Sequence, residues 1–485
     1  MLSRLNEMTG AIAAGHPLTA EAGARVLEAG GSAVDACVAA AFVSWVCESP
    51  LTGPGGGGFM LVHEARSGRT GVLDFFVAVP AEAAAGELLE LAVDFDGDTQ
   101  QLFRTGAAAV GVPGTALGLE AAHRRFGRMP WRELVEPAVR LARDGFEVTQ
   151  AQAYLHGILD PLLRHSPEGD AMYGVEGRSP RAGEQLAFPE LAATLERLAA
   201  EGATALYRGE CARAIVDHVQ AGGGALQLGD LGSYRVIRRR PVAVEYRGHE
   251  FRSNPPPSSG GVLVGLGLQA LGDAEPTTSA IVGAMEAQEA VRGAAFARAL
   301  YRGGLAKRVL SGTTHISVLA GGGDAASLSA SLGSGSGVVV PGTGIHLNNM
   351  LGELDLIGAS RPGERLTSMM APSIVLRDGR PRLVLGSAGS ARLRGAILQV
   401  VANVVGRDLG VEQAVDAPRV HAESGVVHCE DPAAAAVLES EGRSVVRWRE
   451  RNLYFGGVSA VEVLDDGAFS AAGDPRRGGG SVVVA

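Results

Sequence analysis

A threonine in the second half of the chain, Thr313, is the residue with the clearest potential for covalent chemistry. It follows Gly312 and begins the run Thr313-Thr314-His315. A threonine hydroxyl is a weak nucleophile that needs a base beside it. If the bond between Gly312 and Thr313 were cut, the new α-amino group would provide that base within the same residue. The same run is also ordinary for the start of a strand, because threonine favours β-structure.

The residues after Thr313 have the pattern of a β-hairpin. Residues 313–318 alternate between two faces, a glycine-rich turn follows, and the alternation resumes up to Leu332. A hairpin centred on Gly322 places Thr313 opposite Ser331, and facing residues in such a pair have Cβ atoms about 4.5–5.5 Å apart. A hydroxyl would then lie beside the candidate nucleophile and orient it by hydrogen bonding. An ordinary Thr–Ser cross-strand pair explains the pattern equally well.

Two further segments offer groups for acyl chemistry. Gly386-Ser387-Ala388-Gly389-Ser390 follows an apolar run, and a strand that ends in such a turn presents backbone N–H groups to a developing oxyanion. Thr367-Ser368 provides two adjacent hydroxyls suited to a carboxylate ligand. A plain strand-to-helix turn and a capping turn are the structural alternatives.

Helices and strands that would position these residues alternate along the chain. A helix capped by Thr19 is predicted up to about Ala29, and a second helix, apolar nearly all round and therefore buried, is predicted over 33–47. A strand is predicted for Val242–Tyr246. The alternation of helices with two clusters of strands is typical of a layered α/β protein. Further helices are predicted at 114–125, 131–143, 280–301 and 393–407, and further strands at 59–63 and 70–75.

The composition excludes several classes of protein. Of the 485 residues, 46% are hydrophobic, enough for a large core in several domains or in one packed α/β unit. A formal net charge of −10 argues against nucleic acid or an anionic membrane as a partner. The four scattered cysteines show no metal or redox spacing, so neither a metal nor a cofactor is predicted. No apolar secretory signal or membrane-length apolar run is visible, which indicates a cytoplasmic protein with no membrane partner.

The glycine run 55–58 raises a nucleotide-binding alternative. No Gly-Lys-Ser/Thr follows the run, and the segment before it is predicted to be helical, whereas a phosphate-binding loop follows a strand. The sequence therefore disfavours a phosphate-binding loop at this position.

Taken together, the motifs resemble those of the gamma-glutamyltransferase family of N-terminal nucleophile hydrolases. The resemblance extends over residues 16–480. Each string is weak alone, but their order and joint occurrence are specific. The matching strings lie at residues 16–18, 30–36, 55–59, 111–114, 141–145, 256–261, 313–315, 341–345, 347–349, 417–419 and 473–476.

The resemblance implies a four-layer αββα sandwich, of mixed α/β (α+β) class, made as one precursor. Self-cleavage before Thr313 would give a large segment, residues 1–312, and a small segment, 313–485, which stay associated as one intertwined unit. Thr313 would be the nucleophile and its new α-amino group the base. Ser331 would replace a family threonine that hydrogen-bonds the nucleophile.

The resemblance also implies an oxyanion hole and a substrate shell. No metal or cofactor belongs to them. The residues expected to form them are Gly389 and Ser390 for the oxyanion, Thr367 and Ser368 for the substrate carboxylate, and Glu353 for the substrate ammonium group.

Three positions in the glutamyl-recognition shell depart from the family pattern. The family's Asp-Phe-Arg motif, whose arginine grips the substrate α-carboxylate, reads Asp-Phe-Phe at 74–76. Gly333 replaces a family asparagine, and Met350 replaces a glutamine or glutamate. Losing one partner of a buried charge pair costs roughly 2–5 kcal/mol. Phe76 therefore favours a donor with an apolar acyl end, unless a nearby arginine such as Arg365 replaces the missing guanidinium.

The sequence thus predicts an enzyme that transfers the acyl group of an amide to water or to an amine. The predicted donor is a γ-glutamyl amide such as glutathione. The alternatives are a non-glutamyl donor, as in cephalosporin-acylase-like members of this superfamily, and a non-catalytic relative that acts as a scaffold. The predicted partners are a small-molecule amide and, for each cleaved segment, the other segment. Members of this family are often exported, although no signal is visible here.

Overall fold

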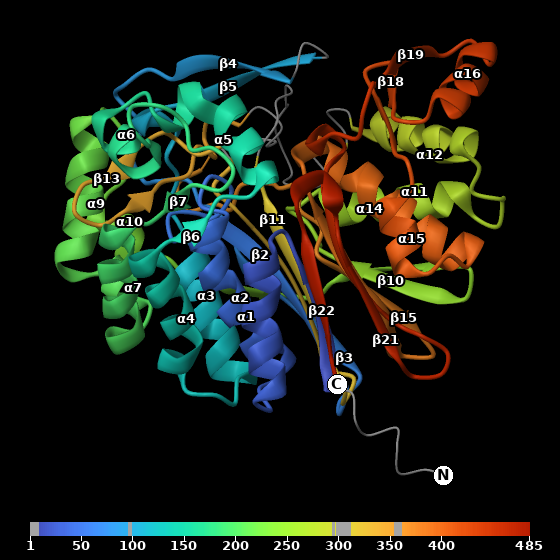
Figure 1. Ribbon diagram of the computed structural model, residues 1–485, viewed down its shortest axis with the longest axis horizontal. Coiled ribbons are helices and arrows are strands. Elements are labelled where there is room, and N and C mark those ends of the chain that lie inside the picture. The colour runs from blue at the N-terminus through green and yellow to red at the C-terminus, as the bar shows by residue number, and fades with distance from the viewer. Residues whose placement is uncertain (1–8, 96–98, 293–295, 297–311, 354–360) are drawn as a thin grey trace.

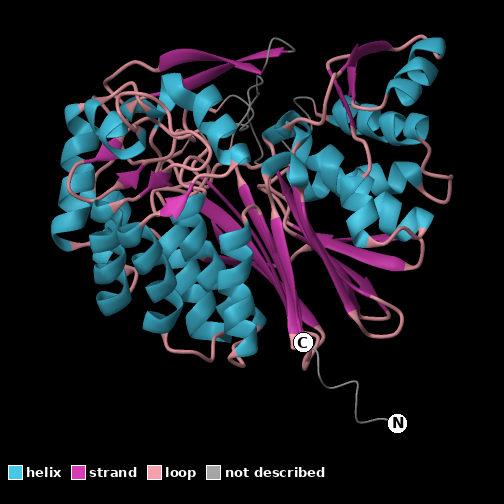
Figure 2. Cartoon of the chain, in the orientation of Figure 1, coloured by secondary structure: helices cyan, strands magenta, loops and turns pink. Residues whose placement is uncertain are grey.

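Two stacked β-sheets form the centre of the molecule, and helices cover the outer face of each sheet (Figures 1 and 2). The structure is a computed structural model, and it describes residues 9–95, 99–292, 296, 312–353 and 361–485. The layers follow the order helix, sheet, sheet, helix. The predicted αββα sandwich is therefore confirmed.

The first sheet is antiparallel and combines strands from both sides of residue 313. Three of its strands follow residue 313 and four precede it, with β1 between β22 and β11. The two segments therefore share one hydrogen-bonded sheet. Its strands, in spatial order, are β22 (Gly480–Val484), β1 (Gly10–Ala14), β11 (Thr314–Ala320), β12 (Ala325–Ser331), β2 (Gly57–Glu64), β3 (Arg69–Phe75) and β8 (Ile237–Arg239).

The second sheet also combines strands from both sides of residue 313. The predicted strand Val242–Tyr246 is confirmed as its edge strand β9. The order of the strands is β21 (Phe469–Gly473), β20 (Gly457–Val463), β16 (Arg380–Ala388), β15 (Ser373–Arg377), β10 (His249–Ser253) and β9. Small sheets pair β4 (Leu89–Phe95) with β5 (Thr99–Thr105), β6 (Phe146–Glu147) with β7 (Gln185–Leu186), β13 (Val339–Val340) with β14 (Ile345–His346), and β17 (Val420–Glu423) with β18 (Val426–Cys429) and β19 (Ser444–Arg447).

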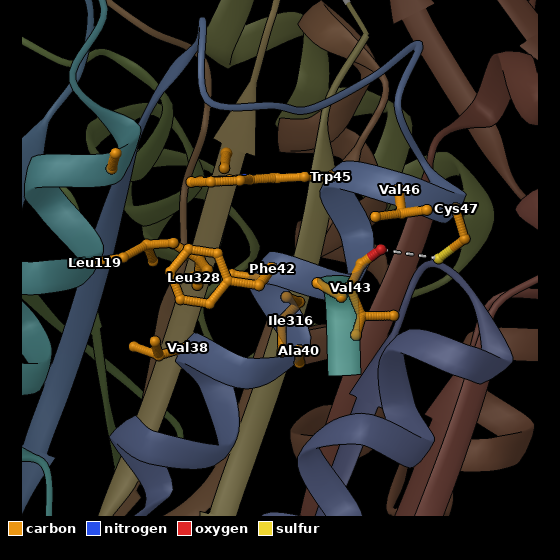
Figure 3. Close-up of a cluster of buried hydrophobic side chains, with 14 of the residues drawn as sticks. Val38, Ala40, Phe42, Val43, Trp45, Val46, Cys47, Leu119, Ile316 and Leu328 are labelled. Carbon is orange, nitrogen blue, oxygen red and sulfur yellow. Dashed lines mark hydrogen bonds between the residues drawn. The ribbon is translucent and has the colours of Figure 1, made fainter. Parts of the chain in front are cut away.

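Helices from residues 17–233 cover the first sheet and the region beside it. The buried helix predicted at 33–47 is α2, and every one of its residues is buried. Figure 3 shows Phe42 of α2 beside Leu119 and Leu328, from a neighbouring helix and from β12. The helices of this group are α1 (Pro17–Glu28), α2 (Ala33–Cys47), α3 (Thr115–Phe126), α4 (Trp131–Asp144), α5 (Gln150–Leu163), α6 (Pro167–Tyr173), α7 (Pro189–Glu201), α8 (Thr204–Tyr207), α9 (Gly209–Ala221) and α10 (Leu228–Ser233).

A second helical layer packs on the outer face of the second sheet through its own apolar cluster. The helix predicted from residue 280 is α12, and its predicted end at 301 lies outside the described residues. The helices of this layer are α11 (Gly260–Leu271), α12 (Thr278–Val291), α14 (Leu393–Val401), α15 (Val411–Asp416) and α16 (Pro432–Ser440). Short helical turns are η1 (Ala107–Ala109), η2 (Ser390–Arg392), η3 (Ala402–Gly406), η4 (Leu453–Phe455) and η5 (Pro475–Arg477).

The start of α1 differs from the prediction. His16 is the N-cap, and its side chain accepts a hydrogen bond from the backbone N–H of Leu18 at 3.2 Å. The predicted cap, Thr19, lies inside the helix because Pro17 already occupies the first helical position, where proline is favoured. The Thr19 hydroxyl is therefore available for contacts outside its own helix.

No helix in the described ranges combines the length and the apolar character that a membrane-spanning helix needs.

Candidate active site

The hairpin of β11 and β12 has the predicted register. Thr314 pairs with Ala330 and Leu319 pairs with Ala325, so the hairpin is centred on residue 322. Thr313 lies directly before β11, and Ser331 is the last residue of β12. The alternating pattern and the glycine turn specify this register, because a slip of one residue would move every side chain to the other face.

The Ser331 hydroxyl lies beside the peptide bond that precedes Thr313. It donates a hydrogen bond to the carbonyl oxygen of Gly312 and accepts one from the backbone N–H of Gly333 at 2.8 Å. Thr313 is fully buried, and its hydroxyl has no hydrogen-bond partner among the described residues. In the continuous chain, Ser331 therefore contacts the carbonyl of the bond before Thr313.

The polar face of β11 lies between the two sheets. His315 makes hydrogen bonds with the hydroxyls of Ser329 at 2.8 Å and Ser317 at 2.9 Å, and burial lowers the pKa of His315 to about 3. The imidazole lies against Gly386 of β16, where a Cβ atom would come within 2.3 Å of the ring. Only glycine fits this contact, which places the start of β11 near the end of β16.

A cavity of about 40 Å³ lies next to Thr313. Its wall combines Thr313 and Thr314 with His16, the N-cap of α1, and with residues from α2, α5, β16, β20 and η5. It includes Ala388, the residue before Gly389. Most of its polar residues were not singled out from the sequence, because they come from segments far apart in the chain. The ionisable and amide side chains around Thr313 are those of His16, Cys47, Glu48, Gln152, His315, Asp474 and Arg477.

Glu48 contributes a buried carboxyl group to this wall. It follows the last residue of α2, is 5% exposed, and accepts hydrogen bonds from the hydroxyls of Thr19 at 2.9 Å and of Thr314. Burial raises the pKa of Glu48 to about 7, although the two hydrogen bonds and the positive charge of Arg477 oppose the rise. The only sequence signal for this residue was a lone acid directly after a buried apolar helix.

Replacing Glu48 with glutamine should stabilise the protein at alkaline pH. The pKa of Glu48 is raised from 4.5 to about 7 in the folded state. The protonated carboxyl group therefore contributes its full stabilisation of the folded state at low pH, and this contribution is lost as the pH rises through about 7. We expect Glu48→Gln to raise the free energy of unfolding by about 3 kcal/mol at pH 8 and to leave it unchanged at pH 4. Denaturant unfolding in a Thr313→Ala background measures the difference. An equal effect at both pH values would contradict the raised pKa.

The turn after β16 has a strained and tightly packed backbone. Gly389 has φ 125°, and Ser390, which is buried, has φ 56°. A non-glycine residue in the left-handed region costs about 1–3 kcal/mol and is often found at functional sites. A Cβ on Gly389 would lie 2.7 Å from Gly456 and 3.6 Å from Nη2 of Arg477. The predicted oxyanion turn therefore lies beside a guanidinium group.

The predicted carboxylate and ammonium ligands are buried outside the wall of this cavity. The Ser368 hydroxyl accepts a hydrogen bond from the backbone N–H of Met370 at 3.0 Å, and Thr367 is also buried. Glu353 is 5% exposed, and its Oε1 lies 3.0 Å from the Cβ position of Gly333. Glu353 is thus close to the end of β12 that carries Ser331.

Phe76 is packed into the core between the sheets. It is 1% exposed and stacks on Phe59 with the ring centroids 5.3 Å apart. Arg365, the possible substitute for the missing guanidinium, places its Nε 3.5 Å from Oδ1 of Asp74 and stacks over the Tyr234 ring at 4.1 Å. Arg365 is therefore engaged by this aspartate and this aromatic ring.

A buried ion network supports the wall of the cavity that contains Asp474. Asp474 pairs with Arg419 and Arg476, and both Asp474 and Arg419 are 2% exposed. Asp474 also accepts a hydrogen bond from the backbone N–H of Val458 in β20 at 2.9 Å. Arg476 pairs in addition with Glu430. Arg419 also donates hydrogen bonds to the carbonyl oxygens of Phe455 and Gly456, so the network reaches the backbone that packs against Gly389.

The four cysteines are buried and free. The Cys47 thiol donates a hydrogen bond to the carbonyl oxygen of Val43 at 3.3 Å (Figure 3). Burial raises the pKa of Cys47 well above its usual value, so it is not a thiolate at neutral pH. In the part of the chain that the structure describes, no group of three or more His, Cys, Asp or Glu side chains could bind a metal ion.

A profile of the family described as gamma-glutamyltranspeptidase matches this chain over residues 19–303 and 284–484. The chain belongs to the gamma-glutamyltranspeptidase family. The glutathione hydrolase proenzyme of Escherichia coli (strain K12) is 30% identical over 531 residues, which cover 96% of this chain and 90% of that protein. The Acylase ACY 1 proenzyme of Pseudomonas sp. (strain SE83) is 33% identical over 529 residues, which cover 98% and 93%.

The structural comparison agrees with this membership of the gamma-glutamyltranspeptidase family. The crystal structure of cephalosporin acylase from Bacillus halodurans superposes with a TM-score of 0.84 at 25% identity, over 98% of this chain and 96% of that one. Both the predicted family and the prediction of an enzyme are therefore confirmed, and a nucleotide-binding loop at 55–58 is not needed to explain the glycine run. Two of these glycines, Gly57 and Gly58, instead pair with Ser331 and Ala330 in the first sheet.

Proposed function

We propose that this chain cuts itself between Gly312 and Thr313, and that Thr313 then acts as the N-terminal nucleophile of an acyl-transfer enzyme. The observation that carries the proposal is the hydrogen bond from Ser331 to the Gly312 carbonyl, beside the unpartnered hydroxyl of Thr313. A hydrogen bond to a carbonyl oxygen stabilises the negative charge that develops there during attack. The relatives described as proenzymes support the same maturation step.

In the cleaved enzyme, the α-amino group of Thr313 takes the hydroxyl proton as the hydroxyl attacks the acyl carbonyl. The backbone N–H groups of Gly389 and Ser390 stabilise the oxyanion, a role that their strained turn beside the cavity supports. The leaving amine departs protonated. Water or an acceptor amine then attacks the acyl-enzyme and releases the acyl group. The two segments stay associated because strands of both are hydrogen-bonded to each other within both sheets.

We propose a γ-glutamyl amide such as glutathione as the donor. The relatives described as glutathione hydrolases support this class. Glu353 near Gly333 offers a carboxylate for the substrate ammonium, and Thr367 and Ser368 offer hydroxyls for the carboxylate.

A donor without the glutamyl group is the second candidate, and three observations favour it. Phe76 is packed against Phe59 where the family has an arginine, and Arg365 is engaged by Asp74. A Cβ on Gly333 would lie only 1.9 Å from Oδ1 of Asn349, so the Asn349 amide occupies the space that a side chain at position 333 would need. The relative described as an acylase and the cephalosporin acylase structure are consistent with such a donor.

A comparison of p-nitroanilides distinguishes the two donor classes. With a γ-glutamyl donor, we expect kcat/KM to be at least about tenfold higher for γ-glutamyl-p-nitroanilide than for glutaryl-p-nitroanilide, which lacks the ammonium group. Glu353→Gln should reduce that ratio, whereas Glu147→Gln, at an exposed position, should leave it unchanged. A ratio near one, or a preference for the glutaryl or a simple acyl anilide, would instead establish the second candidate.

A further inference from the structure

Self-cleavage needs a proton acceptor that the mature enzyme does not need. Until the bond before Thr313 breaks, the nitrogen of Thr313 is an amide and cannot act as a base. The Thr313 hydroxyl must nevertheless lose its proton to attack the Gly312 carbonyl. The cavity next to Thr313 is the place to look for the acceptor, because at about 40 Å³ it has room for about two or three water molecules that relay a proton.

Most ionisable groups around the cavity cannot accept a proton near neutral pH. Burial lowers the pKa of His16 to about 4 and that of His315 to about 3, and both His315 nitrogens are engaged by serine hydroxyls. Burial raises the pKa of the Cys47 thiol well above its usual value. Asp474 is paired with two arginines. Arg477 is a cation whose pKa burial lowers only to about 10. Glu48 is the remaining group of this wall.

Glu48 is placed to exchange a proton with the residues at the nucleophile. Its Oε2 accepts a hydrogen bond from Thr314, the residue after Thr313, and its Oε1 accepts one from Thr19 at 2.9 Å. The carboxyl group lies at the C-terminal end of α2, where the helix dipole opposes negative charge. Burial keeps the pKa of Glu48 near 7, so both protonation states are accessible at neutral pH.

We propose that Glu48, through water in this cavity, accepts the proton of the Thr313 hydroxyl during self-cleavage. The hydroxyl oxygen bonds to the Gly312 carbonyl carbon, whose bond to the Thr313 nitrogen breaks. The nitrogen takes the proton back through the same water and Glu48. Water then hydrolyses the resulting ester, which leaves a carboxylate on Gly312 and a free amine on Thr313. The inference rests on the proposed self-cleavage, and Glu48 is distinct from the base of the mature enzyme.

The pH dependence of maturation tests this role. Newly synthesised chain from a cell-free reaction is exchanged into buffers from pH 5 to pH 9, and loss of the intact 49.7 kDa chain is followed by denaturing mass spectrometry. We expect the wild-type rate to rise with pH and to level off above about 7. Glu48→Gln keeps the shape and the hydrogen-bonding capacity of the side chain. It should slow cleavage at least about a hundredfold and abolish the inflection, whereas Glu82→Gln at an exposed position should cleave like wild type.

A second variant keeps the test valid if Glu48→Gln folds poorly. The hydrogen bond from Thr314 lowers the pKa of Glu48, so Thr314→Val should move the inflection of the cleavage rate upward by about one pH unit. A purely structural role for Glu48 predicts no such shift. The proposal is overturned if Glu48→Gln matures within about threefold of the wild-type rate, or if Thr314→Val leaves the inflection in place. A wild-type chain that never cleaves would refute the proposed function itself.

Discussion

Replacing Thr313 with alanine will leave a single chain of 49.7 kDa and reduce acyl transfer to background. The variant lacks the hydroxyl that we propose attacks the Gly312 carbonyl, so we expect that the chain does not cut itself and gains no N-terminal nucleophile. Loss of a covalent nucleophile costs at least about 10⁴-fold in kcat. The Ser331 hydrogen bond to the Gly312 carbonyl does not involve the Thr313 side chain and remains. Denaturing mass spectrometry and an anilide assay measure both effects.

Two controls separate the loss of the hydroxyl from a loss of structure. Thr313→Ser retains the hydroxyl and should still yield two fragments, the smaller one beginning at residue 313. Thr204→Ala, at an exposed position on α8, should behave as wild type in both measurements. Cleavage at this bond in the Thr313→Ala chain, or turnover by it, would mean that another residue is the nucleophile.

Replacing Asp474 with alanine should cause the largest loss of stability among single substitutions near the cavity. The change leaves Arg419 buried without its carboxylate and removes one of the two acidic partners of Arg476. Removing one partner of a buried ion pair costs about 3–5 kcal/mol, because an uncompensated charge remains in the interior. The same change removes the acceptor of the Val458 N–H at the start of β20. Denaturant unfolding measures the loss.

Asp465 provides the matched control for Asp474. It pairs with Arg377, but its side chain is 81% exposed. Water and salt screen such a pair, so Asp465→Ala should leave the unfolding curve unchanged. If the two alanine variants unfolded alike, burial would not be the source of the stability that Asp474 provides.

Local patterns allowed the elements around Thr313 to be predicted. The register of β11 and β12 follows from side-chain alternation and a short glycine turn, which act over fewer than twenty residues. The apolar run of α2 and its Ser32–Asp35 capping box specify a buried helix in the same way. The predicted start of α1 was wrong by a few residues, because Pro17 favours the first turn of a helix and the helix therefore begins before Thr19, the predicted cap.

The environment of the site could not be predicted, because it depends on contacts between distant segments. Glu48 and Thr314 are 266 positions apart in the chain. Asp74 and Arg365 form an ion pair, although no sequence pattern links their two segments. Phe76 was expected at the substrate, but whether it contacts a ligand or another aromatic ring depends on where Phe59 lies. Short-range periodicity contains no information on such contacts.

The amino-acid sequence alone was enough to predict the hairpin that follows Thr313 and the family, because alternation, turn chemistry and ordered motifs are local properties of the chain. Only the tertiary structure decided the chemical state of the groups around Thr313. Folding excludes water from Glu48 and places two hydroxyls on its carboxylate, and this burial moves its pKa to about 7. The free energy of a buried charge depends on its surroundings in three dimensions.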